Sequence, residues 1–233
     1  MTQQLVSRLS GLYAGDQVGL YAGVESTIAH KHAVEQLVVQ FTQIQGNREA
    51  DSKHHGGGDR VIHHFPREHY GQYRRWDMIS DGRDAPSMGE NISTVGVSEH
   101  EVNIGDIIQF GEVIVQVTQP RAPCFKLNRQ FGHPQFALTM QNTALCGWFY
   151  KVLSSGVIHQ HDNMVLIARC SDISLAHAME IYFSVEFDQQ AYQQLLGCEG
   201  LASSWQTSLA HRLDTGIIEP WEMRLYGENV PPK

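Results

Sequence analysis

Short apolar runs separated by turn residues dominate the first 170 residues of the chain. Strand-like composition, rich in Val, Ile and aromatic residues, recurs in five stretches: 37–44, 103–110, 113–117, 148–153 and 164–169. The second and third stretches flank Gly111-Glu112, which predicts a β-hairpin. The fourth and fifth look like another pair, joined through Ser154-Ser155-Gly156. Many short strands at this spacing predict an antiparallel barrel or sandwich.

Two helices are predicted to interrupt these strands. Pro66 suits the first position of a helix, and the residues that follow it predict a helix as far as Trp76. A second helix is predicted to follow Pro134 and to reach Asn142.

Helical spacing replaces the strand pattern after Cys170. Residues of the N-cap type, Ser or Asp, precede apolar positions at helical spacing three times. The predicted helices cover 174–183, 188–196 and 203–213, and Ser203 or Ser204 can cap the last of them. The chain is therefore predicted to be mainly β with added helices. A β-barrel-like domain would cover residues 1–170, and a small three-helix domain would cover 171–233.

Composition excludes some classes of protein. With 42% hydrophobic residues over 233 positions, the chain can bury a substantial core. A net charge of −8 argues against general nucleic-acid binding, which needs a basic face. The sequence contains neither a membrane-span-length apolar run nor the apolar stretch of a signal peptide. The four cysteines lack CxxC spacing, so we expect free thiols and a cytoplasmic location.

Cys124 is the strongest candidate for chemistry. The strand-like stretch 111–118 runs directly into Gln119-Pro120-Arg121-Ala122-Pro123-Cys124, where two prolines fix the backbone. Arg121 and Lys126 lie close to it in sequence. Positive neighbours favour the thiolate, which is the form that binds metals or attacks. The alternative is a small buried hydrophobic residue at a strand end, because free cysteines are often buried.

A glycine-rich loop is the second candidate. In His55-Gly56-Gly57-Gly58-Asp59-Arg60, three glycines expose backbone N–H groups, and the flanking His55 and Arg60 suit an anion. The loop is not a Walker motif, and a flexible turn is the alternative. Glu90 and Asn91 form a compact polar set that could read the amide edge of a heterocycle, or could be an ordinary polar turn.

Histidines are dense between His54 and His69, but their spacing matches no zinc motif. On a strand, His63 and His64 would point to opposite faces. His55 or His64 is a hypothetical proton relay near neutral pH.

Several of these motifs occur together in one order and resemble the MOSC domain family, named after the C-terminal domain of molybdenum cofactor sulfurase. The chain is similar to the YiiM-like members, in which three helices follow the MOSC domain. The motifs are His55-Gly-Gly-Gly-Asp-Arg60, Phe65-Pro-Arg-Glu-His-Tyr70, Gly89-Glu-Asn-Ile-Ser-Thr94, Gly105-Asp106 and Gln119-Pro-Arg-Ala-Pro-Cys124.

The resemblance implies a β-barrel and a pyranopterin molybdenum cofactor with Cys124 as the molybdenum ligand. It implies that the cofactor pocket is lined by His55, Gly57, Arg60, Glu90, Asn91 and Arg121. It further implies reduction of N-hydroxylated compounds, such as 6-N-hydroxylaminopurine, to amines. Because no flavin, haem or iron–sulfur motif is visible, electrons are expected from a separate redox protein.

Other functions stay open at this point. Cys124 could carry a persulfide for sulfur transfer, or the chain could bind the cofactor without catalysing a reaction. The sequence does not reveal the oligomeric state, for which a dimer is one option. Cys146, Cys170 and Cys198 match no motif and are interpreted as packing residues.

Overall fold

The computed structural model describes residues 4–17, 19–21, 24–26, 28–47 and 57–228. The strands are β1 (Gln4–Ala14), β2 (Gly19–Tyr21), β3 (Val24–Ser26), β4 (His32–Ala33), β5 (Gln36–Val39), β6 (Ile62–His64), β7 (Ile92–Thr94), β8 (Ile107–Phe110), β9 (Val113–Pro120), β10 (Trp148–Ser154), β11 (Gly156–His159) and β12 (Asn163–Ala168). The helices, with 3-10 turns marked η, are η1 (Ile28–His30), η2 (Gly58–Arg60), α2 (Glu68–Arg75), α3 (Phe125–Phe131), α4 (Phe136–Thr143), α5 (Leu175–Tyr182), α6 (Gln189–Leu196), α7 (Ser203–Thr215) and α8 (Glu222–Tyr226).

The main sheet closes into a barrel. Its strands follow the order β12-β8-β9-β10-β6-β7-β1, and β12 also pairs with β1, which joins the two ends. The short strand β4 adds to β1 outside this ring. The predicted hairpin is confirmed, because β8 and β9 pair antiparallel with Phe110 opposite Val113. Closure removes the open sheet edges and decides between the predicted barrel and the sandwich in favour of the barrel.

The predicted pairing of residues 148–153 with 164–169 is wrong. Strand β10 pairs with β9 on one side and β6 on the other, so it offers no free edge to β12. The chain instead leaves the barrel as β11, which pairs with β5, and returns as β12 between β8 and β1. The predicted turn at 154–156 is therefore present, but it joins β10 to β11 and not to β12.

Alternation along the strands separates an interior from an outer face. Val117 lies opposite Tyr150 in the β9–β10 register, and both are fully buried. The ring of Trp148 packs on His64 with centroids 4.2 Å apart, on the same inner side as Tyr150. Phe149 lies between these two positions along β10 and therefore points outward. Its ring contacts His63, with centroids 4.9 Å apart, so the outer side of this wall is available for a site.

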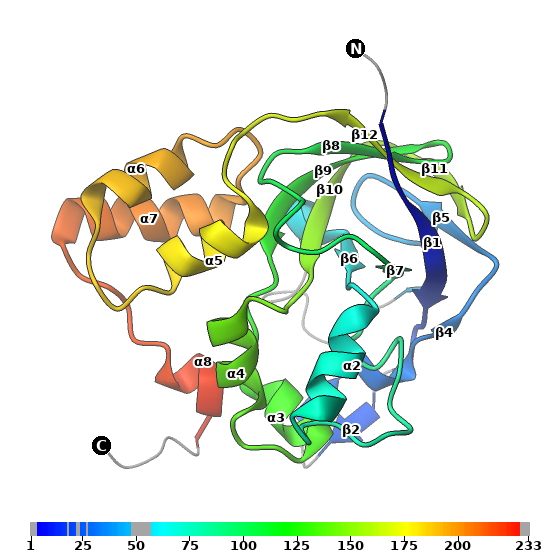
Figure 1. The fold of residues 1–233 in the computed structure, drawn as a ribbon, viewed down its shortest axis with the longest axis horizontal. Coiled ribbons are helices and arrows are strands. Elements are labelled where there is room, and N and C mark those ends of the chain that lie inside the picture. The colour runs from blue at the N-terminus through cyan, green and yellow to red at the C-terminus, as the bar shows by residue number, and fades with distance from the viewer. Residues whose placement is uncertain (1–3, 18, 22–23, 27, 48–56, 229–233) are drawn as a thin grey trace.

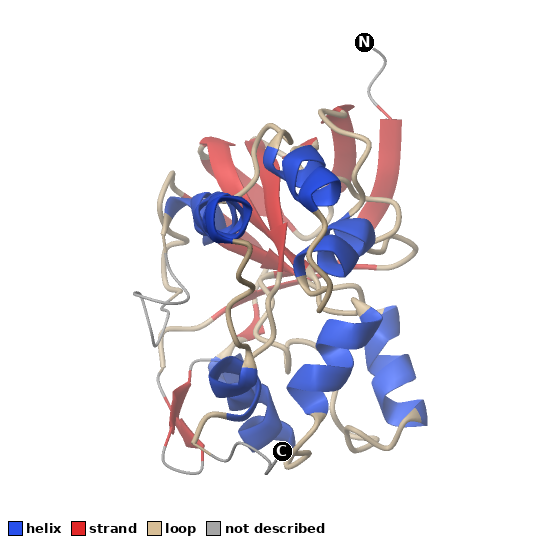
Figure 2. Ribbon diagram, turned by 90° about the vertical axis from the view of Figure 1, so that its left-hand side faces the viewer, coloured by secondary structure: helices blue, strands red, loops and turns tan. Residues whose placement is uncertain are grey.

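Helices cover two regions outside the barrel. Figure 1 shows α5, α6 and α7 together on one flank, while α2, α3 and α4 lie below the strands. Figure 2 shows the same separation from the side, with the strands concentrated at one end and a group of helices at the other. Helix α8 packs against α3 and α4, so the chain returns to the barrel domain after α7.

The five predicted helices are present as α2, α4, α5, α6 and α7, and the Ser174 and Asp188 caps are confirmed. The proposed cap of α7 is wrong, because its N-cap is Ala202. The backbone N–H and the hydroxyl of Ser203 both donate to Asp59 Oδ2, at 2.9 and 2.7 Å. A carboxylate from the barrel domain therefore replaces the local cap.

Candidate active site

Cys124 lies where β9 has ended and α3 begins. It is the N-cap residue of α3, with an extended backbone at φ −136° and ψ 166°. Only 9% of the residue is exposed, and that part lines a cavity of about 630 Å³. The cysteine is therefore both tightly packed and open to a ligand-sized space, as a metal-binding or reactive thiol must be.

Four basic side chains line the same cavity. Arg121 and Lys126 come from the segment around Cys124, Arg60 from η2, and Arg224 from α8. The sequence places Arg121 and Lys126 close to Cys124, and the resemblance to the MOSC family adds Arg60. The structure brings all three to one cavity. Arg224 was not predicted, because it lies a hundred positions further along the chain from Cys124.

Arg121 and Arg224 carry guanidinium groups that hydrogen-bond to neutral oxygen atoms in the described structure. Arg121 is 8% exposed and donates to the carbonyl oxygen of Met88 at 3.0 Å. Arg224 donates to the carbonyl oxygen of Pro123 and to Gln141 Oε1. Burial lowers the pKa of Arg121, and lowers that of Arg224 to about 10, although the electrostatic interaction of each with Cys124 opposes the shift. Within the described ranges, neither forms an ion pair with a carboxylate.

Basic side chains outnumber carboxylates among the described residues that line the cavity, because Glu219 lines it too but is ion-paired with Arg212. This excess of positive charge indicates the kind of ligand that fits. Buried charges in proteins are normally paired, because an unpaired one loses its hydration without compensation. Two guanidiniums beside a thiol therefore suit an anionic ligand that also offers a soft metal. A pyranopterin molybdenum cofactor has both properties, since it carries phosphate and dithiolene groups together with the metal.

Arg60 connects the barrel to the C-terminal helices. Its Nε donates to Gln119 Oε1 at 3.2 Å, and its Nη2 donates to the Ser204 hydroxyl at 2.9 Å. The preceding residue, Asp59, accepts the two hydrogen bonds from Ser203 already described. The turn after the glycine loop therefore lines the cavity and fixes the start of α7 at the same time.

The glycine loop is only partly described. His55 lies outside the described residues, so its predicted role stays a prediction. Gly57 precedes η2 with φ +107°, in the region that favours glycine, and an added Cβ would meet no heavy atom of the described residues within 4 Å. This open approach is compatible with the predicted contact between backbone and ligand.

Glu90 and Asn91 are buried behind the cavity rather than among its lining residues. Asn91 Nδ2 donates to the carbonyl of Tyr13 and to Asn47 Oδ1, and its Oδ1 accepts from the backbone N–H of His63. The hydrogen bonds of its amide group thus hold β1 and β6 together, and reading a heterocycle would require breaking them.

The Glu90 carboxyl accepts from the Tyr70 hydroxyl at 2.7 Å and from the Met88 N–H at 3.1 Å. The same Met88 residue accepts from Arg121 through its carbonyl oxygen. Burial raises the pKa of Glu90 to about 7, against the opposing effect of these hydrogen bonds and of Arg121. Met88 therefore links the two side chains, because its N–H donates to Glu90 and its carbonyl oxygen accepts from Arg121.

His63 and His64 point to opposite sides of the barrel wall, as the sequence predicted. Both nitrogens of His64 are engaged inside the barrel, with the Tyr150 hydroxyl and with Thr94 Oγ1. Burial lowers the pKa of His64 to about 3, so the ring stays neutral near pH 7, and its role as a proton relay stays a prediction. His63 lies on the outer side, and its Nε2 has no hydrogen-bond partner among the described residues.

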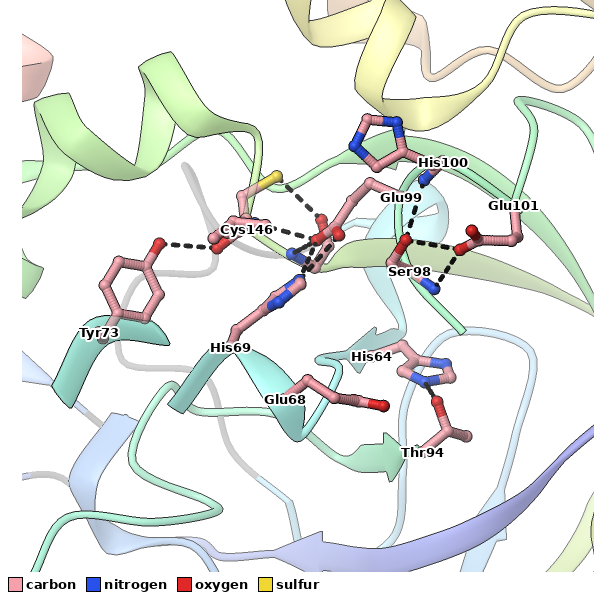
Figure 3. Close-up of polar contacts among 12 residues, drawn as sticks. His64, Glu68, His69, Tyr73, Thr94, Ser98, Glu99, His100, Glu101 and Cys146 are labelled. Atoms are coloured by element: carbon pink, nitrogen blue, oxygen red, sulfur yellow. Dashed lines mark hydrogen bonds and ion pairs between the residues drawn. The ribbon is translucent and has the colours of Figure 1, made fainter. Parts of the chain in front are cut away.

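A buried carboxylate that sequence reasoning missed holds the turn beside the site (Figure 3). Glu99 accepts from His69 Nε2 at 2.8 Å and from the backbone N–H groups of Cys146 and Gly147, at 3.0 and 2.6 Å. The Gly147 carbonyl in turn accepts from the backbone N–H of Arg121. Gly147 has φ +70°, and a Cβ there would lie 2.2 Å from the His64 carbonyl oxygen, so this tight turn requires glycine.

Comparison with known proteins agrees with this geometry. The model of the MOSC domain matches residues 51–165, and the model of the YiiM-like 3-alpha helix domain matches residues 173–216. With its closed barrel, its cavity-facing cysteine and its appended helices, the chain belongs to the MOSC domain family.

Within that family it is similar to the YiiM proteins. The YiiM protein of Escherichia coli is 37% identical over 218 residues, which is 93% of this chain and 97% of that protein. The crystal structure of Escherichia coli YiiM superposes with a TM-score of 0.80 at 33% identity and covers 94% of this chain and 99% of that one. A protein named reductase from Gibberella moniliformis is 36% identical over 130 residues, which is 55% of this chain and 23% of that protein.

No helix in the described part of the chain is long and apolar enough to cross a membrane. All four cysteines are free: Cys124, Cys146 and Cys198 are buried, and Cys170 is half-buried.

Proposed function

We propose that the protein is a molybdenum-cofactor-dependent reductase that converts N-hydroxylated compounds, such as 6-N-hydroxylaminopurine, to amines. The observation that carries the proposal is the cavity at Cys124, which is also lined by two guanidiniums that form no ion pair with a carboxylate among the described residues. Membership of the MOSC family supports it, because MOSC domains are generally associated with molybdenum cofactor binding. The similarity to a protein named reductase supports the class of reaction.

The residues of the cavity fit the cofactor. Cys124 would be the thiolate ligand, since a soft sulfur suits molybdenum. Arg121 and Arg60 would hold anionic groups through charge-assisted hydrogen bonds. When bound, the cofactor would supply two-electron redox chemistry, while the protein supplies binding, orientation and electrostatics.

The proposed reaction balances with two electrons and two protons. The N–O bond of R–NHOH breaks, one proton goes to nitrogen and one to the departing hydroxyl, and the products are R–NH2 and water. The electrons would come from a separate redox protein, because the sequence has no flavin, haem or iron–sulfur motif. In the Gibberella moniliformis reductase, most of the chain lies outside the matched region, so a similar site there belongs to a longer protein.

The test is expression in a host that makes the molybdenum cofactor, followed by measurement of metal content and turnover. Wild-type protein should contain about one molybdenum per chain and reduce 6-N-hydroxylaminopurine with a reduced viologen as donor. Cys124→Ser should lose turnover while keeping its circular dichroism spectrum, because oxygen is a poor substitute for a soft ligand. Cys170→Ser, which changes a half-buried cysteine away from the cavity, should behave like wild type.

Two results would contradict the proposal. Retained turnover in Cys124→Ser would show that the thiol is not the ligand. A persulfide on Cys124 in metal-free wild-type protein would favour sulfur transfer instead.

A further inference from the structure

The C-terminal helices supply an aromatic wall to the cavity. Phe183 follows α5, Trp205 belongs to α7, and Trp221 is the N-cap residue of α8, and all three line the cavity that contains Cys124. Both indole rings stand nearly perpendicular to Phe183, at 87° for Trp205 and 81° for Trp221. Three large rings from three separate elements thus meet at one space, a composition that suits a flat ligand.

Polar donors accompany these rings. The Arg224 guanidinium lies over Phe183, 4.7 Å from the ring centroid, and its hydrogen bonds to Pro123 and Gln141 use two of its five N–H groups. Because the Arg224 guanidinium lines the cavity and has N–H groups beyond those two, the preferred ligand is a ring that carries acceptor atoms rather than a plain hydrocarbon ring.

Arg224 also links the aromatic wall to the thiol. It donates to the carbonyl of Pro123, which is the residue before Cys124. A ring held against this aromatic wall beside Arg224 would therefore lie within the same cavity as the sulfur, as a substrate must if it reacts at a metal bound there.

We propose that Phe183, Trp205 and Trp221, together with Arg224, form a ring-binding subsite that selects planar heteroaromatic hydroxylamines over small aliphatic ones. This inference rests on the proposed function, and it assigns substrate selection to the C-terminal helices. The barrel domain would hold the cofactor, and the helical segment would recognise the ring of the substrate.

The test compares two substrates in a variant and a matched control. Trp221→Leu removes a ring from the wall, and Trp76→Leu removes a 40% exposed tryptophan at the end of α2, outside the cavity. For 6-N-hydroxylaminopurine, kcat/KM should fall about tenfold in Trp221→Leu, because one aromatic contact contributes on the order of 1 kcal/mol. For N-methylhydroxylamine it should stay within about twofold. Trp76→Leu should change neither value.

A second measurement needs no metal. Calorimetric titration of adenine into metal-free protein should give a Kd about tenfold weaker for Trp221→Leu than for wild type, and an unchanged Kd for Trp76→Leu. Phe183→Leu, which alters a half-buried ring of the same wall, should weaken adenine binding in the same direction.

The outcomes separate this inference from the proposed reaction. If wild type reduces both substrates and Trp221→Leu keeps the same preference for the purine, the subsite is wrong and the reaction stands. If wild type reduces neither substrate but adenine affinity depends on Trp221 as expected, the subsite stands and the reaction is wrong. Equal adenine affinity in wild type, Trp221→Leu and Phe183→Leu would overturn the subsite.

Discussion

Glu90 gives the protein a pH-dependent stability that a single isosteric substitution should remove. Its carboxyl is fully buried and accepts hydrogen bonds from Tyr70 and Met88. Burial raises its pKa from 4.5 to about 7, more than the hydrogen bonds and the charges of Lys31 and Arg121 lower it. The unfolded chain therefore releases this proton near pH 4.5, while the folded protein holds it until about pH 7.

The magnitude follows from proton linkage. Between pH 4.5 and 7 the folded state holds more protons at this site than the unfolded state, so stability falls as pH rises. At about 1.4 kcal/mol for each pH unit, a shift of about 2.5 units corresponds to roughly 3 kcal/mol. This contribution is complete below the unfolded pKa and lost once pH has risen through the folded pKa. Glu90→Gln resembles the protonated carboxyl in shape and charge and does not titrate.

Urea denaturation of the metal-free protein, followed by circular dichroism from pH 4.5 to 8, measures the effect. The free energy of unfolding of Glu90→Gln should rise by about 3 kcal/mol relative to wild type across this range. Glu180→Gln, which removes a largely exposed carboxylate, controls for the change in net charge. A difference between Glu90→Gln and wild type that stays constant with pH would refute the reasoning.

Two further predictions concern arginines. Arg60→Ala and Arg121→Ala should each lower the molybdenum content of protein from cofactor-competent cells by about tenfold, because each loses a charge-assisted contact. Elemental analysis measures this, and unchanged occupancy would count against both assignments. Arg212→Met should lower the free energy of unfolding by about 3 kcal/mol, because Arg212 is fully buried, donates to Tyr182 and forms an ion pair with the partly exposed Glu219. Urea denaturation tests this, and a loss below about 1 kcal/mol would contradict it.

Features that depend on neighbours in sequence could be predicted. The hairpin at Gly111-Glu112 could be predicted, because a turn residue and two flanking apolar strands lie within twenty positions. Ser174 and Asp188 gave the caps of α5 and α6 in the same way. Cys124 was found because the strand, the prolines and Arg121 are contiguous with it, so its backbone position follows from local rules.

Features that depend on distant contacts could not be predicted. Glu99 belongs to no recognisable motif, and its importance comes from His69 and Cys146, which only the folded chain brings to it. Helix α8 has five residues and no strong periodic pattern, yet it delivers Arg224 to the cavity. For Asn91, the residue type led to a predicted contact with a ligand. In the structure its side-chain amide forms its hydrogen bonds with Tyr13, Asn47 and His63 instead.

The contacts of Arg60 mean that its variant needs careful interpretation. Arg60 donates to Ser204, and its neighbour Asp59 accepts from Ser203, so this turn joins the barrel to α7 as well as lining the cavity. Arg121 has no such contact with the C-terminal helices in the described structure, since its side chain donates to Met88 within the barrel domain. If both variants lose molybdenum, the cause would therefore be the loss of a positive charge that holds the cofactor. Loss in Arg60→Ala alone, together with weaker adenine binding, would instead indicate that α7 has moved and that the two halves of the cavity depend on each other.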